Sequence, residues 1–208
     1  MTHIILVRHG QTEWNRIERF RGRIDIELNE TGHRQAEAVS RRLCKGKVGA
    51  IYSSPLKRAL QTAWAIAESC GLQVQPLEGI TDIDYGGWSG HSPEEVASRY
   101  GDLHRAWLDT PHLVQFPNGE SLDQVRTRAM DILGRVSLPG GSETVVLVSH
   151  LVVNRVLICA ALGLSNSSFW KIAQDNAAIN IVEAQEGKYR LLLLNDTCHL
   201  ESVFCTQV

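Results

Sequence analysis

Short runs of apolar residues, several of them β-branched, predict the strands of a buried sheet. They lie at residues 4–7, 50–52, 73–77 and 144–149, and the last run is apolar from Val145 to Val148. A strand that is apolar on both faces is typical of the centre of a parallel sheet. Segments 178–183 and 189–194 flank Glu186-Gly187 and predict a final pair of strands.

Segments with apolar residues at helical spacing separate these strands. Helices are predicted at 29–43, 54–70, 92–100, 103–108, 122–136 and 154–162, whereas 13–20 suits a helix or an irregular turn. Thr31 and Ser54 are the expected N-caps of the first two helices, and Gly71 is expected to end the second. Residues 139–142 predict a turn.

Strands that alternate with helices imply βαβ units and a sheet covered on both faces. The expected fold is therefore α/β: a three-layer α/β/α sandwich whose sheet is mostly parallel, with an antiparallel edge strand. A length of 208 residues without repeat, linker or low-complexity segment fits a single domain, 1–208. Within it, a helical, lid-like insertion is expected at about 90–118.

Composition excludes several classes of protein. Hydrophobic residues at 43% and charged residues at 21% are ordinary for a globular chain. A net charge of −2 gives no field that favours nucleic acid or an anionic membrane. The longest apolar stretch, 156–164, is too short to span a bilayer, and residues 1–8 lack the features of a signal peptide. We therefore expect a cytoplasmic protein with no nucleic-acid or membrane partner.

The cysteines predict neither a metal site nor a disulfide framework. The chain has five of them, at 44, 70, 159, 198 and 205, with no CxxC spacing. A zinc or iron–sulfur site is therefore unsupported, and no metal or other cofactor is expected. A chain long enough to build a full core seldom depends on disulfides. Reduced, mostly buried thiols are the expectation.

Arginine is concentrated near the N-terminus. Five arginines fall within residues 8–23, namely Arg8, Arg16, Arg19, Arg21 and Arg23. The planar guanidinium matches phosphate or carboxylate in a way that the lysine ammonium does not. A solvated helix face would explain the same run, so composition alone leaves both interpretations open.

Residues with catalytic chemistry follow the predicted strands. Arg8-His9-Gly10 follows the first strand, His150 follows the strand 144–149, and Arg58 lies in the first turns of the helix after the second strand. Sites in α/β sheets form beyond the carboxyl ends of the strands. A lone histidine at a strand end is more often structural. Two histidines and two arginines at one sheet edge instead predict a cationic pocket for a dianionic ligand.

The residue types in this pocket narrow the chemistry. Flanking arginines would repel a divalent cation, and the GxSxG elbow of a serine nucleophile is absent. What remains is an imidazole nucleophile, which attacks phosphorus at neutral pH if one nitrogen is unprotonated and the other is held by an acceptor. Arg8, Arg58 and a cationic His150 would then stabilise the transferring phosphoryl group.

The glycine-rich loop 79–90 carries two carboxylates, Asp82 and Asp84. Beside a bound phosphate, the like charge raises the pKa of a carboxyl group, so that it can protonate a leaving alkoxide. The same two aspartates would also serve as Asx caps of tight turns. Both interpretations of Asp82 and Asp84, as a proton donor or as caps of tight turns, therefore stay open from the sequence.

Longer blocks of the chain carry a family resemblance. They are residues 6–15, 21–22 with Asp25, 28–32, 51–62, 82–90, 119–121 and 146–150. In this order they resemble the histidine phosphatase superfamily, the phosphoglycerate-mutase-like proteins. An Arg-His-Gly triplet alone is weak, whereas ordered blocks at βα-loop positions are specific. The resemblance implies a phosphoglycerate-mutase-like fold and a metal-independent phosphomonoesterase of the histidine acid type.

The resemblance also implies roles for the catalytic residues. His9 would carry the phosphohistidine, and Arg8, Arg58 and His150 would form the phosphate pocket. Asp82 falls where most members have glutamate as the proton donor. Because aspartate is one methylene shorter, Asp84 stays a candidate for that role.

Further positions are candidates for contacts with the substrate. Asn15 would lie at the edge of the phosphate pocket, and Arg21 and Gly22 fall where family members contact phosphate or substrate. Tyr85 and Leu151 are additional candidates.

Within the family, the chain resembles the phosphatase branch. Mutases tend to be longer, and hydrolysis is the default once water reaches a phosphohistidine. The general layout is similar to α-ribazole phosphatases and broad-specificity phosphatases, whereas 169–178 and 194–200 resemble metal-independent phosphoserine phosphatases. The expected substrate is a small phosphorylated metabolite, with phosphoserine favoured and an α-ribazole phosphatase or a phosphoglycerate mutase as alternatives.

Two questions stay open from the sequence. The tail around Cys198-His199 would either fold over the active site or only finish a sheet edge or a subunit contact, and a homodimer is one such assembly. The non-enzyme alternative is a regulatory member that binds a phosphate ligand or a protein. The intact set of Arg8, His9, Arg58 and His150 argues against that alternative.

Overall fold

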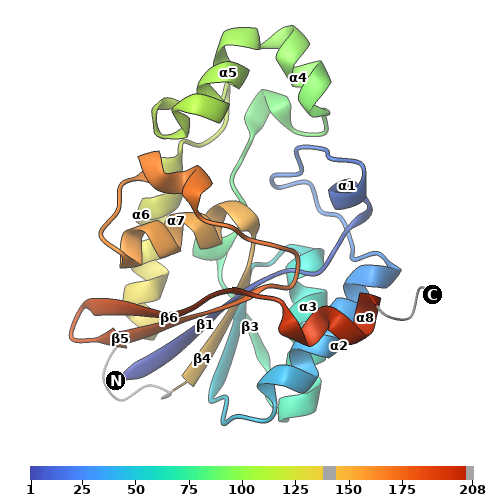
Figure 1. Cartoon of the computed structure of the whole chain (residues 1–208), viewed down its shortest axis with the longest axis vertical. Coiled ribbons are helices and arrows are strands. Elements are labelled where there is room, and N and C mark those ends of the chain that lie inside the picture. The colour runs from blue at the N-terminus through green and yellow to red at the C-terminus, as the bar shows by residue number, and fades with distance from the viewer. Residues whose placement is uncertain (138–143, 205–208) are drawn as a thin grey trace.

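A computed structural model describes residues 1–137 and 144–204 of the chain. Six strands among these residues form one sheet in the order β3-β2-β4-β1-β5-β6 (Figure 1). The pairs among β1 to β4 are parallel, and β5 runs antiparallel to both β1 and β6. The predicted α/β class, with a mostly parallel sheet and an antiparallel pair at one edge, is confirmed. The strands are β1 (Thr2–Arg8), β2 (Ala50–Ser53), β3 (Val74–Pro76), β4 (Thr144–Ser149), β5 (Ile179–Gln185) and β6 (Lys188–Asp196).

Helices cover both faces of the sheet, with α2 and α3 on one face and α6 and α7 on the other (Figure 1). Along β1, the side chains of Ile4 and Leu6 pack in the core beneath α6 and α7, whereas Ile5 and Val7 pack beneath α2 and α3. This alternation follows from the two-residue period of a strand. The helices are α1 (Glu13–Arg16), α2 (Glu30–Leu43), α3 (Lys57–Cys70), α4 (Pro93–Arg99), α5 (Gly101–Asp109), α6 (Leu122–Val136), α7 (Leu151–Ala161) and α8 (Glu201–Phe204).

A helical segment lies beyond the carboxyl edge of the sheet, at the top of Figure 1. It consists of α4, α5 and the short 3-10 helix Pro111–Leu113. Val96 and Trp107 of this segment are buried in the same core as Trp88 and Phe116. The segment therefore packs as part of the single fold, and its function as a lid stays a prediction.

The N-caps predicted for two helices are wrong. Asn29, not Thr31, caps α2, and its side chain accepts a hydrogen bond from Gly32 at 2.9 Å. The next helix, α3, begins at Lys57, whose backbone N–H donates to the Asp25 carboxylate at 2.7 Å. A carboxylate from a distant loop therefore caps this helix, whereas the hydroxyl of Ser54 accepts the backbone N–H of Leu56 at 3.3 Å, one residue before the helix begins. Gly71 ends α3 with a φ of 65°, as predicted.

The expectation of reduced cysteines is wrong for one pair. Cys44 and Cys70 form a disulfide, with Cα atoms 5.6 Å apart. Cys44 directly follows α2 and Cys70 is the last residue of α3, so side-by-side packing of the two helices with their C-terminal ends together brings the two thiols within bonding reach. Sequence spacing does not show this contact, because it is made by tertiary packing. Cys159 is a buried free cysteine, and Cys198 is an exposed one.

The remaining elements agree with prediction within a few residues. The helix predicted at 154–162 begins earlier, at Leu151, directly after the strand that precedes it. The turn predicted at 139–142 lies outside the described residues. None of the helices in the described part of the chain has the length and apolar character needed to cross a bilayer.

Candidate active site

The parallel strands β1, β4 and β2 bring the predicted catalytic residues to one edge of the sheet. Arg8 pairs with Ser149 in the register of β1 and β4, so His9 and His150 follow side by side. The backbone N–H of His9 donates to the Ser149 carbonyl at 3.0 Å, and the two imidazole centroids are 5.2 Å apart. Arg58, in the first turn of α3, reaches the same edge after β2.

His9 has the geometry of a nucleophile. Its Nδ1 lies 2.7 Å from the carbonyl oxygen of Gly10, which can only accept a hydrogen bond. This contact assigns the ring proton to Nδ1 and leaves the lone pair of Nε2 free. The side chain is 1% exposed, and burial, together with the charges of Arg58 and Arg8, holds the pKa of His9 well below 6.5. The imidazole is therefore uncharged at neutral pH.

Gly10 allows the loop that carries His9 to lie against α2. A Cβ atom at this position would come within 2.5 Å of the Gly32 carbonyl oxygen, so any other residue would push the loop away from the helix. The N–H of Gly10 donates to the hydroxyl of Thr62 at 3.1 Å, and this hydroxyl donates to the carbonyl of Arg58 at 2.8 Å. The His9 loop and the Arg58 turn are thus tied together through one threonine.

Arg8 and Arg58 place two buried cations beside His9. Arg58 is fully buried, and its Nη2 donates to the Gly22 carbonyl at 2.7 Å and to Asp82 Oδ2 at 3.0 Å. Arg8 donates from Nη1 to the Gln174 carbonyl at 2.6 Å. Burial lowers the pKa of Arg8 to about 9 and also lowers the pKa of Arg58, so both stay charged at neutral pH. Among the described residues, the Nε–H of each arginine has no acceptor, which leaves donors for phosphate oxygens.

His150 is oriented by the serine that was expected to cap α3. The hydroxyl of Ser54 lies 2.8 Å from Nε2 of His150, and Nδ1 lies 3.7 Å from Asp82 Oδ2. Burial and the neighbouring charge of Arg58 hold the pKa of His150 well below 6.5. The cationic state expected for His150 is therefore wrong for the folded protein at neutral pH. A neutral imidazole still offers one N–H to an anion.

The two carboxylates of the loop 79–90 have different surroundings. Asp82 is 5% exposed; its Oδ2 accepts from Arg58, and its Oδ1 accepts the backbone N–H of Ile83 at 3.0 Å. Asp84 accepts the N–H of Gly86 at 2.8 Å, which is the Asx-turn arrangement. Only Asp82 of the two lines the cleft at this site.

A partly buried ion pair holds the Asp82 loop from the other side. Arg128 of α6 donates to the Thr81 carbonyl at 2.6 Å and to the Asp82 carbonyl at 3.2 Å. It also pairs with Glu120 at 2.9 Å, and Glu120 accepts the N–H of Asp84 at 2.9 Å. The conformation of the loop is therefore set by the start of α6, which explains why a Gly119-Glu-Ser block belongs to the same site.

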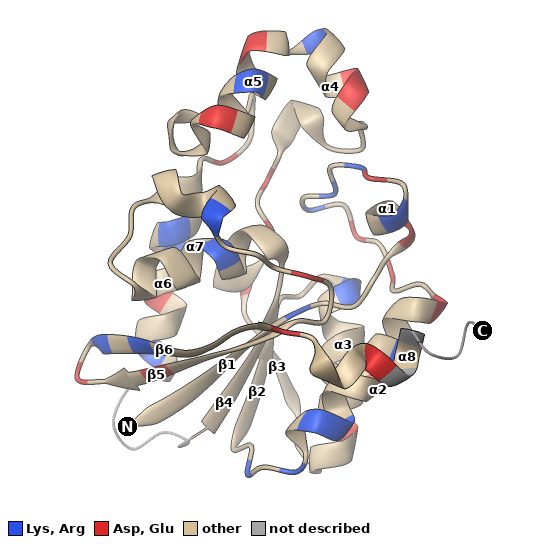
Figure 2. Ribbon diagram, in the orientation of Figure 1, with Lys and Arg blue, Asp and Glu red and all other residues tan. Residues whose placement is uncertain are grey.

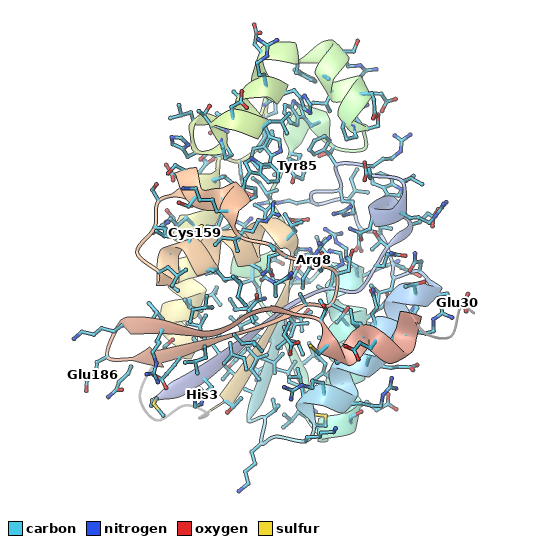
Figure 3. All side chains as sticks on the ribbon, viewed as in Figure 1. His3, Arg8, Glu30, Tyr85, Cys159 and Glu186 are labelled. Atoms are coloured by element: carbon cyan, nitrogen blue, oxygen red, sulfur yellow. A yellow bond between two sulfur atoms is a disulfide. The ribbon has the colours of Figure 1, made fainter. Side chains whose placement is uncertain are left out.

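A cleft of about 180 Å³ opens beside Asp82. Figure 3 shows Tyr85 on the α5 side of this region and Arg8 at the end of β1. Of the predicted substrate contacts, Arg21, Tyr85 and Leu151 line the cleft, whereas Asn15 and Gly22 do not. The lining residues are Arg19, Phe20, Arg21, Asp82, Tyr85, Trp107, Leu151, Val152 and Trp170.

Asn15 and Gly22 instead support the residues around the cleft. The side-chain oxygen of Asn15 accepts from the backbone N–H and the hydroxyl of Thr12, which caps α1. Gly22 has a φ of 50° and gives its carbonyl to Arg58. A Cβ atom on Gly22 would meet the Ile83 carbonyl at 2.9 Å, so the glycine lets two loops of the site touch.

The charge of the site is cationic on balance. In Figure 2, lysine and arginine positions at the end of β1, on α7 and in the loop around α1 surround the middle of the molecule. Burial is the main cause that lowers the pKa of Arg21, and this arginine donates to the backbone carbonyl of Trp14 at 3.1 Å. No group of three or more His, Cys, Asp or Glu side chains converges as metal ligands within residues 1–137 and 144–204.

Sequence reasoning missed Gln174. Its carbonyl accepts from Arg8, and its side-chain oxygen accepts from Asn180 at 3.0 Å and from Asn154 at 3.3 Å. This buried amide network connects α7 and β5 to the phosphate pocket. Gln174 lies in the segment 169–178 that carries a family resemblance, but a lone amide has no chemical signature in the sequence.

The tail packs against α2 as far as it is described. The Nε2–H of His199 donates a hydrogen bond to the Ala177 carbonyl at 3.1 Å, and Leu200 is buried in the core beneath α2 and α3. No residue of the segment 194–200 lines the cleft. Ala177 donates its N–H to the His9 carbonyl at 3.2 Å, so the residue that His199 contacts also supports the His9 loop.

Stability is expected to fall in mild acid because of the two buried histidines. Both pKa values lie below 6.5 in the folded protein. The free energy of unfolding is therefore highest above about pH 6.5, the pKa of histidine in the unfolded chain, and it falls as the pH drops below that value. Each histidine contributes a slope of about 1.4 kcal/mol per pH unit within that window. Urea unfolding between about pH 6.5 and 5 measures the slope. His9→Gln should reduce this slope. An unchanged slope would contradict the inference that His9 is buried in its uncharged form.

Comparison with known proteins identifies the family to which this chain belongs. A sequence profile of the histidine phosphatase superfamily (branch 1) matches residues 4–197. The chain belongs to this superfamily, and it is a phosphoric monoester hydrolase by class.

Three similar proteins can be placed beside it. Phosphoserine phosphatase 1 of Hydrogenobacter thermophilus is 42% identical over 200 residues, covering 96% of this chain and 95% of that protein. The metal-independent phosphoserine phosphatase of Arabidopsis thaliana is 34% identical over 206 residues, covering 98% and 85%. The solved structure of Bacillus stearothermophilus YhfR superposes with a TM-score of 0.92 at 28% identity, covering 97% of this chain and 100% of that one.

Proposed function

We propose that this phosphatase hydrolyses phosphoserine, or small phosphate esters of similar size, through a covalent phosphohistidine on His9. The observation that carries the proposal is the His9 ring: uncharged, with Nδ1–H donated to Gly10 and buried between Arg8 and Arg58. Relatives at 42% and 34% identity that are named phosphoserine phosphatases support the choice of substrate. A mutase would have to exclude water from the same intermediate.

In the first step, Nε2 of His9 attacks phosphorus, and the bond from phosphorus to the ester oxygen breaks. The free Nε–H groups of Arg8 and Arg58, together with one N–H of His150, neutralise the charge on the non-bridging oxygens. The leaving oxygen takes its proton from Asp82. In the second step, water attacks the phosphohistidine, its proton returns to Asp82, and phosphate leaves with the Nε2 lone pair restored.

Asp82 has to be protonated for the first step, although Arg58 stabilises its carboxylate before the substrate binds. A phosphate dianion would compete for the guanidinium of Arg58 and place a like charge beside the carboxylate. The 3.7 Å separation between His150 Nδ1 and Asp82 Oδ2 is too long for a hydrogen bond, and Nδ1 has no other partner among the described residues, so it can interact with a phosphate oxygen.

Transfer of label tests the covalent step. Protein quenched during turnover of 32P-labelled phosphoserine is expected to retain acid-labile, base-stable label, and a peptide containing His9 is expected to carry it. The control is His33→Ala, which removes an exposed histidine. Turnover without label on His9 in a rapid quench would overturn the mechanism. Transfer between positions of a phosphoglycerate without release of phosphate would indicate a mutase.

Asp82→Asn is expected to slow hydrolysis according to the leaving group. An alkyl ester such as phosphoserine needs a proton on its poor leaving oxygen, so its kcat should fall about 10²- to 10⁴-fold. Nitrophenyl phosphate has a good leaving group, and its kcat should fall far less. Asp84→Asn, which alters only the turn cap, is the matched control. Equal losses for both esters in Asp82→Asn would move the acid role elsewhere.

Catalysis without a metal ion follows from the same charges. The buried guanidinium groups do the charge neutralisation that a divalent cation would otherwise supply, and they would repel such a cation. Activity is therefore expected to persist in excess chelator.

Cellular location and assembly stay predictions from the sequence. A location in the cytoplasm would put the enzyme where charged phosphate esters are retained, since they do not cross bilayers. A homodimer would be detected by light scattering at micromolar concentration.

A further inference from the structure

Arg155 is a cation next to two residues of the cleft wall, Leu151 and Trp170, and the catalytic steps leave it unused. It lies on α7 one helical turn after Leu151, and residues four apart share a helix face. Leu151 lines the cleft. The Nε and Nη1 atoms of Arg155 are buried and have no hydrogen-bond partner within the described residues. Buried donors without acceptors are costly, so such a group beside a cleft wall is a candidate for binding a ligand.

Two aromatic rings hold the guanidinium in place. The Cζ atom of Arg155 lies 5.1 Å from the ring centroid of Phe169 and 4.9 Å from that of Trp170. Phe169 is fully buried, and the indole N–H of Trp170 donates to the Trp107 carbonyl at 2.8 Å, so neither ring is free to move. Cation–π contacts fix the plane of the guanidinium without using its N–H donors.

One of these rings places Arg155 next to the cleft. Trp170 lines the cleft beside Asp82, and so does Trp107, whose carbonyl accepts the indole N–H of Trp170. The positive charge of Arg155 also lowers the pKa of Arg8 and opposes the burial that raises the pKa of Tyr85. Arg155 therefore lies beside the wall of the cleft into which a substrate would extend from the phosphate pocket.

Asp175 is the nearby carboxylate that would otherwise satisfy Arg155. Its negative charge acts on Arg155 and on Arg8, yet it forms no ion pair with either of them. Instead its Oδ2 accepts from the side-chain amide of Asn195 at 2.7 Å. The charge of Arg155 is partly offset by Asp175, but its N–H donors stay available.

We propose that Arg155 determines specificity by binding a carboxylate carried by the leaving group of the substrate. This inference rests on the proposed function and deepens it. The substrates of the enzyme would then be phosphate esters with a second anionic group near the ester oxygen, a class to which phosphoserine belongs. The planar fork of arginine suits a carboxylate. The cleft beside it is lined in part by four aromatic residues, Phe20, Tyr85, Trp107 and Trp170.

A pair of esters that differ only in the carboxylate tests this assignment. Phosphoserine and phosphoethanolamine share the phosphate, the ester and the amine, and only the first has the carboxylate. Wild-type protein is expected to prefer phosphoserine in kcat/KM. Arg155→Met should lower kcat/KM for phosphoserine about 10- to 100-fold, mostly through KM, and change it for phosphoethanolamine less than about threefold.

Two further variants make the outcome decisive. Lys171→Met removes an exposed cation next to Trp170 and should leave the preference unchanged. Arg155→Lys keeps the charge but loses the fork, so it should retain only part of the preference, and it replaces the Met variant if that protein does not fold. Equal losses for both esters, or no preference in wild type, would overturn the role of Arg155. Absence of hydrolysis of either ester and of nitrophenyl phosphate by wild type would instead overturn the proposed function.

Discussion

Replacing His9 by alanine is expected to lower kcat for every phosphate monoester by at least about 10⁴-fold. The substitution removes the atom that forms the bond to phosphorus, and no second nucleophile is placed to substitute. His150 is buried 5.2 Å away, ring to ring, but its Nε2 is engaged by Ser54. Steady-state assays with phosphoserine and nitrophenyl phosphate measure the loss, and both esters should lose activity alike.

The fold is expected to survive this change. His9 follows β1 rather than filling the core, and its backbone bond to Ser149 does not involve the side chain. His33→Ala, at an exposed histidine, is the matched control for both activity and thermal unfolding. Residual activity within tenfold of wild type would contradict a covalent role for His9.

Arg58→Ala is expected to damage both catalysis and stability. Loss of a preorganised donor to the transferring phosphoryl group should lower kcat/KM by about 10²- to 10³-fold. The stability effect has a separate cause: Asp82 would lose its charge partner while it stays buried, at a cost of about 3–5 kcal/mol. Assays and urea unfolding at pH 7 measure the two effects independently.

Two companion variants separate these causes. Arg42→Ala removes an exposed arginine and should change neither quantity. In Arg58→Ala combined with Asp82→Ala, part of the lost stability should return because no unpaired carboxylate remains, whereas activity should not return. Wild-type rates in Arg58→Ala would contradict the phosphate pocket. Full additivity of the two stability changes would contradict the buried pair.

The convergence of the candidate residues was predictable where a residue type with catalytic chemistry directly follows a predicted strand. Arg8, His9 and His150 follow buried apolar runs, and parallel strands end at a common edge. Arg58 was predictable because it lies one short turn after β2. These inferences need only local sequence pattern and the topology that alternating strands and helices impose.

Other properties of the site depend on contacts between distant segments. That Asp82 rather than Asp84 lines the cleft is seen only with their partners, since Asp82 pairs with Arg58 and Asp84 accepts the N–H of Gly86. Ser54 was expected to cap a helix, but Asp25 caps that helix and Ser54 contacts His150. Gln174, Thr62 and Arg155 have ordinary residue types, and only their partners give them roles.

The disulfide and the charge states follow the same rule. Cys44 and Cys70 are 26 residues apart in the chain, and the packing of α2 on α3 joins them. His150 was expected to be cationic from its residue type, but burial beside Arg58 makes it neutral. A pKa depends on the surroundings of a group in three dimensions, and residue order does not specify those surroundings.

By itself, the sequence determined the α/β fold, the family and the residues at the strand ends, because periodicity and strand-end motifs are local and repeat in one dimension. Tertiary structure alone decided which nitrogen of His9 is free, which aspartate faces the cleft and which arginine is left without an acceptor. These properties depend on burial and on partners that come together only when segments far apart in the chain pack against one another.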